Sequence, residues 1–168
     1  MSEVRSWFTG RVPDGWFSGA PEVRVDRDEI LVVGVLEAPA AAADLDEEGS
    51  EVARRARIGA FREETRDRRM AIAGDAESLW GRKVSWGVRC GDTEDLFTTH
   101  SAPVMTRLRM SERSVLDTLI DGGVARSRSE ALAWCVRLVS RHEGDWIDQL
   151  REAMTHVEQV RAEGPDVD

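Results

Sequence analysis

The chain has 168 residues, 33% of them charged, and a formal net charge of −9, which is enough for one domain or two small ones with a buried core. Its longest apolar run, ILVVGVL at 30–36, is far shorter than the ~20 residues that cross a bilayer, so no membrane helix is expected. The start MSEVRSWFTG lacks the features of a signal peptide, and Cys90 and Cys135 have no partner spacing, which favours a cytoplasmic protein with reduced thiols.

The first twenty residues contain two aromatic pairs among glycine and proline, Trp7–Phe8 and Trp16–Phe17. We expect loop or extended structure here, with the rings packed over a neighbouring core; an exposed aromatic patch is the less favoured alternative. The segment EVRVDRDEILVVGVLE that follows alternates, breaks at residues 26–29 and then becomes continuously apolar. This pattern predicts a strand, a tight turn and a buried strand.

Residues 38–49, APAAAADLDEEG, have no useful period and predict a mobile connection. From Ser50 to about Trp80 the apolar spacing is helical, and REETRDRR at 62–69 is interpreted as a charged outer face of one long helix. KVSWGVRCGDTEDLFTT then predicts a hairpin. Residues 1–100 are therefore expected to form a small α+β unit with the order strand, strand, long helix, strand, strand.

A different pattern begins at Pro103, where VMTRLRM predicts a short strand in which Arg107 and Arg109 alternate with Leu108 and Met110. Ser111 is placed to cap a helix, ERSVLDTLID, that ends where Gly122 or Gly123 adopts a left-handed conformation. A second helix begins at SRSEA, with Ser127 and Glu130 in capping-box spacing. Its buried face is expected to contain Leu132, Cys135, Val136 and Val139, and a third, amphipathic helix is expected from about Gly144 to Ala162.

This order of strand, helix, glycine turn and helix over residues 103–141 resembles the ribbon-helix-helix DNA-binding domain of the Arc, MetJ and CopG repressors. The resemblance implies a homodimer whose two strands form an antiparallel ribbon in the major groove of double-stranded DNA. Met105, Arg107 and Arg109 would then read bases, and an arginine that bridges guanine O6 and N7 gives ~1–3 kcal/mol of discrimination. Ser127, Arg128 and Ser129, at a helix start, would bind phosphate.

The charge distribution agrees with this interpretation. Residues 104–141 contain seven arginines and four acidic residues, a local charge of +3, whereas residues 142–168 contain two arginines and eight acidic residues, a local charge of −6. The chain departs from the family pattern in two ways, because about a hundred residues precede the ribbon and an acidic helix, 142–168, follows it. The expected fold class is thus α+β: an N-terminal α+β unit, a dimeric ribbon-helix-helix module and a C-terminal amphipathic helix.

Two functions remain open. The first is a dimeric, sequence-specific transcriptional regulator, a repressor for example, in which residues 1–100 respond to a protein or small-molecule effector. The alternative is a dimerisation scaffold or antitoxin-like module that binds a protein and does not depend on DNA.

The sequence contains little that favours catalysis or metal binding. His100, His142 and His156 form no ligand spacing with each other or with the cysteines, so we expect no metal and no cofactor. A nucleophilic pair of Cys90 and His100 is much less favoured than a hairpin thiol beside a loop histidine. We therefore expect a protein that is not an enzyme.

Overall fold

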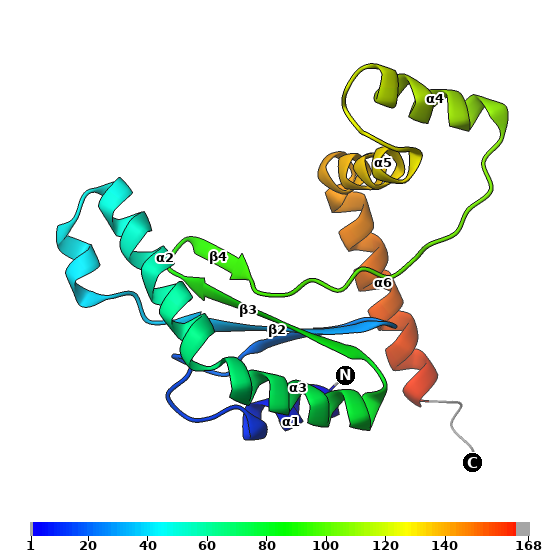
Figure 1. Ribbon diagram of the computed structural model, residues 1–168. Coiled ribbons are helices and arrows are strands. Elements are labelled where there is room, and N and C mark those ends of the chain that lie inside the picture. Colours follow the sequence, from blue (N-terminus) through cyan, green and yellow to red (C-terminus); the bar gives the residue numbers. More distant parts are fainter. Residues whose placement is uncertain (1, 164–168) are drawn as a thin grey trace, which may run out of the picture. The chain divides into compact units, whose positions relative to one another are not determined.

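A computed structural model describes residues 2–163 of the chain and divides it into two compact units, Met1–Val104 and Met105–Asp168. The described residues form one four-stranded sheet and six α-helices (Figure 1). The predicted α+β class is confirmed. The sheet belongs to the first unit, and the second unit is helical.

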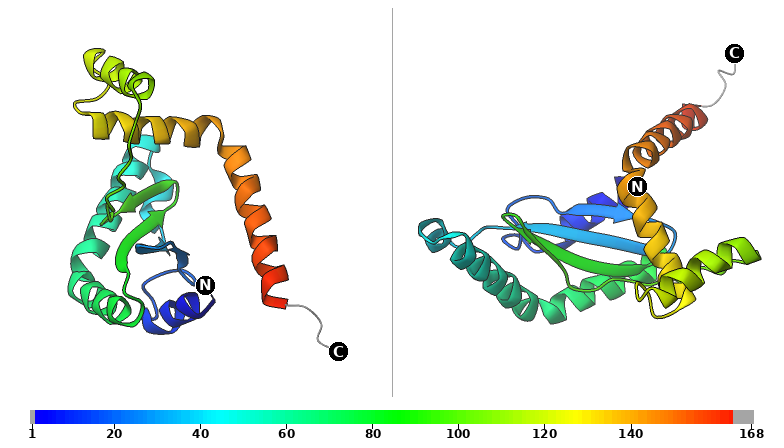
Figure 2. Two further views of the ribbon diagram at one scale, coloured as in Figure 1. Left: turned by 90° about the vertical axis from the view of Figure 1, so that its right-hand side faces the viewer. Right: turned by 90° about the horizontal axis from the view of Figure 1, so that it is seen from above.

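The sheet has the strand order β1-β2-β3-β4, which is also the order along the chain. Its strands are β1 (Glu22–Val25), β2 (Glu29–Leu36), β3 (Lys83–Cys90) and β4 (Thr93–Leu96). The outer pairs β1/β2 and β3/β4 are antiparallel hairpins, while β2 and β3 are parallel. Parallel neighbours need a long crossover, and here it consists of α2 (Glu47–Glu64) and α3 (Arg66–Trp80). The figures show these two helices following one another along the sheet (Figures 1 and 2).

Both predicted turns are present. At the first, the Asp26 carboxylate accepts hydrogen bonds from the N–H groups of Asp28 (2.8 Å) and Glu29 (2.7 Å), which lower the pKa of Asp26. At the second, two residues connect β3 to β4, and Gly91 has φ 58°, a left-handed conformation that suits glycine. The order of the four strands along the first unit is therefore as expected.

The single long helix predicted from Ser50 is interrupted at Thr65. The Thr65 side chain is buried, and its hydroxyl donates to the Phe61 carbonyl oxygen at 2.6 Å. A threonine that bonds back to the preceding turn bends a helix. Arg69, one turn further along, is buried as well, so the interpretation of residues 62–69 as a charged outer face was wrong for Arg69, while the other charged residues of the stretch are exposed.

The predicted connection at 38–49 is shorter than expected. Ala40–Asp44 form a 3-10 helix, η1, and α2 already begins at Glu47. The Asp46 carboxylate caps α2 by accepting the Gly49 N–H at 2.9 Å. An aspartate followed by two acidic residues, Glu47 and Glu48, was the sequence signal for this start.

The loop predicted for the first twenty residues was wrong in part, because Ser2–Arg11 form α1. A helix of this length is marginal alone and depends on packing; Val4 and Phe8, one turn apart, are both buried in the core. The predicted packing of the aromatic rings is confirmed. Trp7 contacts Trp80 with ring centroids 5.2 Å apart, and Phe8 contacts Trp86 at 5.9 Å.

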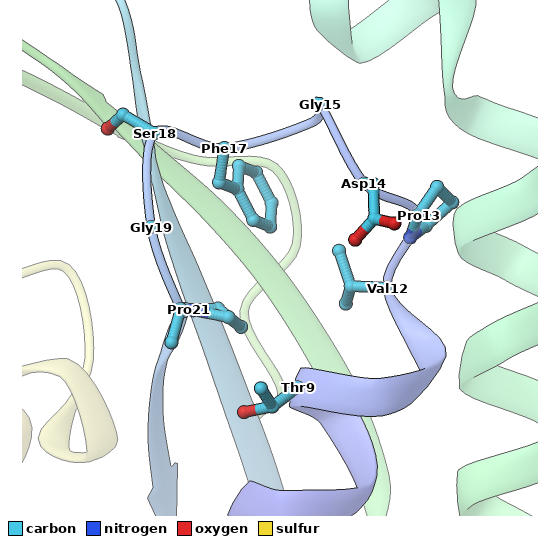
Figure 3. A pocket seen from close by; sticks show the side chains of 10 residues that line it. Thr9, Val12, Pro13, Asp14, Gly15, Phe17, Ser18, Gly19 and Pro21 are labelled. Carbon is cyan, nitrogen blue, oxygen red and sulfur yellow. The ribbon is translucent and has the colours of Figure 1, made fainter.

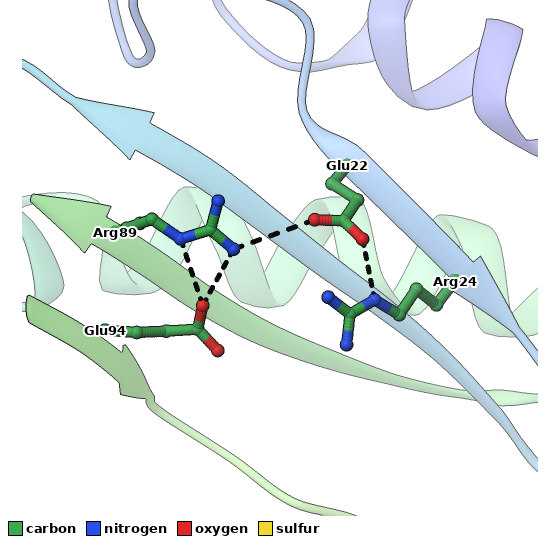
Figure 4. Close-up of polar contacts among 4 residues, drawn as sticks. All are labelled: Glu22, Arg24, Arg89 and Glu94. Carbon is green, nitrogen blue, oxygen red and sulfur yellow. Dashed lines mark hydrogen bonds and ion pairs between the residues drawn. The ribbon is translucent and has the colours of Figure 1, made fainter. Parts of the chain in front are cut away.

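The helices and the sheet share one core in the first unit. Its buried side chains include Val4, Phe8, Ile30, Val32, Ile58, Phe61, Ile72, Ala76, Val84, Trp86 and Val88. The other face of the sheet has charged side chains that pair across the strands (Figure 4). There Glu22 pairs with Arg24 at 2.7 Å, and Arg89 pairs with Glu94 at 2.9 Å and with Glu22 at 3.8 Å. These contacts lower the pKa of Glu22, chiefly through the Arg24 hydrogen bond.

The second unit contains α4 (Met110–Asp121), α5 (Arg128–His142) and α6 (Gly144–Glu163). Its core is small: among the described residues Leu116, Ala125 and Ala131 are buried, with Leu108, Leu119, Ile120, Leu132 and Cys135 packed against them. The predicted left-handed glycine is Gly123, with φ 74°. The predicted buried face of α5 is correct for Leu132 and Cys135, whereas Val136 is 63% and Val139 48% exposed.

The strand predicted at 104–110 is not present in the single chain, where residues 101–109 have no regular secondary structure. A strand exists only where a neighbouring strand accepts and donates its backbone hydrogen bonds, and none of the described residues 2–163 supplies such a neighbour to this segment. Helix α4 begins at Met110, so Met110 is not a strand residue and Ser111 is not the cap. Instead, the Glu112 carboxylate accepts the Arg109 backbone N–H at 2.6 Å.

Gly34 allows the N-terminal loop to pack against β2, because a Cβ atom there would lie 2.1 Å from Cε1 of Phe17. We predict that Gly34→Ala lowers the free energy of unfolding by about 1–3 kcal/mol, the usual cost of overpacking. Denaturant unfolding of the full chain measures this. Gly59→Ala is the matched control, since nothing lies within 4 Å of that position in α2 and alanine there should stabilise by up to ~1 kcal/mol. Equal effects at the two positions would contradict the prediction.

Candidate functional site

The residues predicted to read bases lie at the start of the second unit, just before α4. Met105 is 99% exposed, and Arg107 and Arg109 are also exposed. Leu108 between them is half-buried and packs on the cluster formed by Leu116, Ala125 and Ala131. The alternation expected from the sequence is therefore present at Leu108, which faces inward while both neighbouring arginines face solvent.

Two contacts that involve side chains of α4 hold this segment to the helix, in addition to the backbone bond from the Arg113 N–H to the Arg109 carbonyl oxygen at 2.9 Å. The carbonyl oxygen of Leu108 accepts a hydrogen bond from Arg113 Nη1 at 2.7 Å, and the N–H of Arg109 donates to Glu112. Both contacts use backbone atoms of the segment. The side chains of Arg107 and Arg109 are not used by either contact, so the guanidinium groups stay available to a ligand.

The start of α5 has the geometry expected of a helix cap. Ser127 is the N-cap residue, and its hydroxyl oxygen accepts the Glu130 N–H at 3.2 Å. The Glu130 carboxylate accepts the Arg126 N–H at 2.9 Å, one residue earlier than a regular capping box requires. The N–H groups of Arg128 and Ser129 lie in the first turn, where a helix has no acceptor of its own. This arrangement suits an anion.

Arg128, predicted to bind phosphate, already has a protein partner. Its Nε and Nη2 atoms donate to the two carboxylate oxygens of Asp117 on α4, both at 2.8 Å. This paired geometry lowers the pKa of Asp117 and raises that of Arg128. Residues 117 and 128 are eleven apart in the sequence and have no helical relation to one another, so the sequence did not indicate the pair.

Large apolar side chains remain exposed on all three helices of the second unit and on the segment before them. In α6 they lie at helical spacing and form one stripe, Trp146, Leu150, Met154, Val157 and Val160, between 46% and 59% exposed. The others are Met105, Met110, Val115, Val124, Val136 and Val139. Among its described residues, the second unit thus buries three side chains and exposes eleven large apolar ones, and exposed apolar patches are typical of surfaces that bind other molecules.

The first unit contains a small pocket beside the N-terminal loop (Figure 3). It has a volume of about 240 Å³ and is lined largely by Val12, Pro13, Gly15, Phe17 and Pro21, with Asp14 as its one charged residue. Ligand sites typically measure about 300–1,000 Å³. The pocket is therefore a weaker candidate than the surface of the second unit.

The thiols and acidic side chains give no support for catalysis or metal binding. Cys90 is buried, which raises the pKa of its thiol and disfavours the nucleophilic thiolate. Within residues 2–163 no group of three histidine, cysteine or acidic side chains is placed to hold a metal. The same residues include no helix long and apolar enough to cross a membrane.

Comparison with known proteins matches both units to families. The first matches a model described as the N-terminal domain of Rv1265-like proteins over residues 2–96, and the second matches the Mb1296 C-terminal domain over residues 109–161. The chain belongs to this two-domain family. Arg109, Ser127, Arg128 and Ser129 lie within the second matched range, whereas Met105 and Arg107 lie between the two ranges.

Curated mycobacterial relatives are similar along almost the whole chain. They are the uncharacterized protein Mb1296 of Mycobacterium bovis and the uncharacterized proteins Rv1265 and MT1303 of Mycobacterium tuberculosis. Each is 52% identical over 169 aligned positions, which cover 99% of this chain and 72% of the relative. No solved structure matches the chain.

We predict that Arg128→Ala raises the pKa of Asp117 toward the ordinary value for aspartate, about 3.9. A pKa lowered in the folded state means that the pair stabilises the fold above the unfolded pKa, and that this contribution is lost as the pH falls through the folded pKa. NMR titration of the Asp117 carboxyl in acid measures the change. Arg126→Ala, a nearby charge removal outside the pair, is the control; an Asp117 pKa that is equal in wild type and Arg128→Ala would contradict the prediction.

Proposed function

We propose that the second unit is a homodimeric ribbon-helix-helix module that binds double-stranded DNA sequence-specifically, and that the protein is a cytoplasmic transcriptional regulator. The observation that carries the proposal is that half-buried Leu108 packs against the core while Arg107 and Arg109 are exposed on both sides of it. A ribbon that reads a major groove needs this division between an apolar inner face and a cationic outer face.

The backbone of residues 104–107 supports pairing with a second copy. No hydrogen bond within residues 2–163 engages these backbone groups, whereas the Leu108 carbonyl and the Arg109 N–H are already bonded within the unit. A segment with unsatisfied N–H and C=O groups accepts another strand readily. Two antiparallel copies would bring four guanidinium groups, Arg107 and Arg109 of each chain, to one ribbon face. The exposed apolar side chains of α4 and α5 would be covered by the same association.

The capped start of α5 supports a phosphate contact beside the ribbon. The N–H groups of Arg128 and Ser129 are placed for an anion, and the helix dipole favours negative charge there. The Arg128 guanidinium contributes less, because Asp117 neutralises it. With weak phosphate binding in an acidic protein, affinity for DNA would depend largely on base contacts.

A second candidate function is a dimerisation scaffold or antitoxin-like module that binds a protein. The apolar stripe of α6 favours it, because the stripe is exposed on a helix that also contains Asp145, Asp148, Glu152 and Glu158. On this reading charge reversal at Arg107 and Arg109 would leave binding of the protein partner intact. Loss of that binding from a variant that stays dimeric would count against the scaffold.

We predict that Arg107→Ala and Arg109→Ala relax the choice of DNA sequence while the protein stays dimeric. Each lost guanine contact should reduce discrimination by ~1–3 kcal/mol at its base position. Selection of genomic fragments by purified full-length protein at two salt concentrations, followed by sequencing, measures this. Arg137→Ala on α5, an exposed arginine outside the predicted contacts, is the control. Enrichment of the same site by wild type and the double variant would refute base reading by these arginines.

We predict that Val136→Asp shifts the protein from dimer toward monomer. Val136 is 63% exposed in the single chain, so the substitution does not disturb the core of one unit but places a charge in an apolar interface. Analytical ultracentrifugation over a range of concentrations measures the association. Ala133→Asp adds the same charge at an exposed alanine one turn earlier and should weaken the dimer less. An unchanged dimer in Val136→Asp would exclude this face of α5.

A further inference from the structure

A second cavity in the first unit lies where α2 ends and α3 begins, against the edge of the core. Its volume is about 580 Å³, within the range typical of sites for small molecules. Its lining combines arginines and glutamates of the two helices with apolar side chains. Among the lining residues are Arg62, Arg66, Arg69, Val84, Trp86 and Phe97.

Arg69 is the unusual member of this set, because its side chain is cationic and only 6% exposed. Its Nε donates to Thr65 Oγ1 at 2.9 Å and its Nη2 to the Arg62 carbonyl oxygen at 2.7 Å. The guanidinium carbon lies 4.6 Å from the centroid of the Phe97 ring. All of these partners are neutral groups. No carboxylate among residues 2–163 pairs with this cation, although burying an unpaired charge is costly.

One nitrogen of the guanidinium is left for a ligand. Nη1 of Arg69 makes no hydrogen bond to a described residue. Among these residues, the one side-chain nitrogen that is both fully buried and without a partner is Trp86 Nε1. Nη1 is therefore not fully buried, and it is open to the cavity that Arg69 lines. A planar guanidinium with free N–H groups at a partly dry site is suited to oxyanions.

The cavity is lined by three arginines and two glutamates, Glu63 and Glu77, so its lining carries a net positive charge. The Arg62 guanidinium lies over the same Phe97 ring at 5.6 Å, and the Arg66 side chain is 68% exposed, with its Nη1 3.6 Å from Asp67 Oδ1. The Glu77 carboxylate also lines the cavity but pairs with Lys83 Nζ at 2.7 Å. Burial first, and then Arg62 and Arg66, lower the pKa of Arg69. The negative charge of a bound anion would favour the charged form of Arg69 and so oppose these effects.

We propose that this cavity binds a small organic anion, with carboxylate or phosphate oxygens at Arg69 and Arg66 and an apolar body beside Trp86 and Val84. The site lies within the first unit and does not rest on DNA binding by the second. The proposed ligand has an acidic group that contacts the arginines and a flat apolar part that contacts the apolar side chains.

Calorimetric titration of the full-length protein tests this with four probes: phenyl phosphate, benzoate, phenol and inorganic phosphate. We expect at least one of the two aromatic anions to bind about tenfold or more tightly than phenol, which lacks the charge, and than inorganic phosphate, which lacks the apolar body. The comparison of phenyl phosphate with benzoate identifies the acidic group. Binding of phenol or of inorganic phosphate as tight as that of both aromatic anions would overturn the proposal.

Three variants separate ligand binding from folding. Arg69→Met and Arg66→Ala should each weaken binding of the aromatic anion about tenfold, and Arg68→Ala, an exposed charge removal on the same turn of α3, should not. Circular dichroism shows whether Arg69→Met is folded, since Arg69 also bonds Thr65. If Arg69→Met does not fold, the test is the variant of the exposed Arg66. Weaker binding of the aromatic anion by Arg66→Ala supports the site, whereas an affinity equal to that of Arg68→Ala overturns the proposal.

Discussion

The parallel pairing of β2 with β3 is the constraint on which the first unit depends. Two hairpins become one sheet only because these strands lie side by side in the same direction, and that requires the chain to cross from one end of the sheet to the other. α2 and α3 make the crossing and cover one face. Ile58, Phe61, Ile72 and Ala76 reach the sheet from them. The bend at Thr65 then sets Arg69 against Phe97, and so the arginine-lined cavity follows from the same crossing.

The second unit, in contrast, buries little apolar surface. Three small or medium side chains form its centre, and its helices keep their larger apolar groups exposed. Burial of apolar area is the main favourable contribution to folding, so covering these groups in the proposed dimer would stabilise the unit. The proposed dimer and the proposed DNA contact are thus linked, since the segment that would pair the two chains is the one that presents Arg107 and Arg109.

The arginines of both units differ in whether they pair with a carboxylate. On the open face of the sheet Arg24 and Arg89 are paired with carboxylates, so that surface offers little free positive charge. In the second unit Arg128 is paired as well, while Arg107 and Arg109 are exposed beside an inward-facing leucine. Arg69 is buried with neutral partners. The function of an arginine in this acidic protein therefore depends on whether a carboxylate lies within reach.

The sequence by itself determined the strands, the hairpin turns, the cap at Ser127 and the amphipathic helix after residue 142, because alternation, helical spacing, glycine and capping residues act over a few neighbours. Helical spacing also places Arg69 on the same stripe as Phe61, Thr65, Ile72 and Ala76, but the charged composition of residues 62–69 favoured an exposed face. Only the tertiary structure decided the helix at Ser2–Arg11, the parallel centre of the sheet, the pair of Arg128 with Asp117 and the absence of the strand predicted at 104–110. Each of these depends on partners distant in the chain, or on a neighbouring strand that one chain does not supply, and local pattern has no information about such contacts.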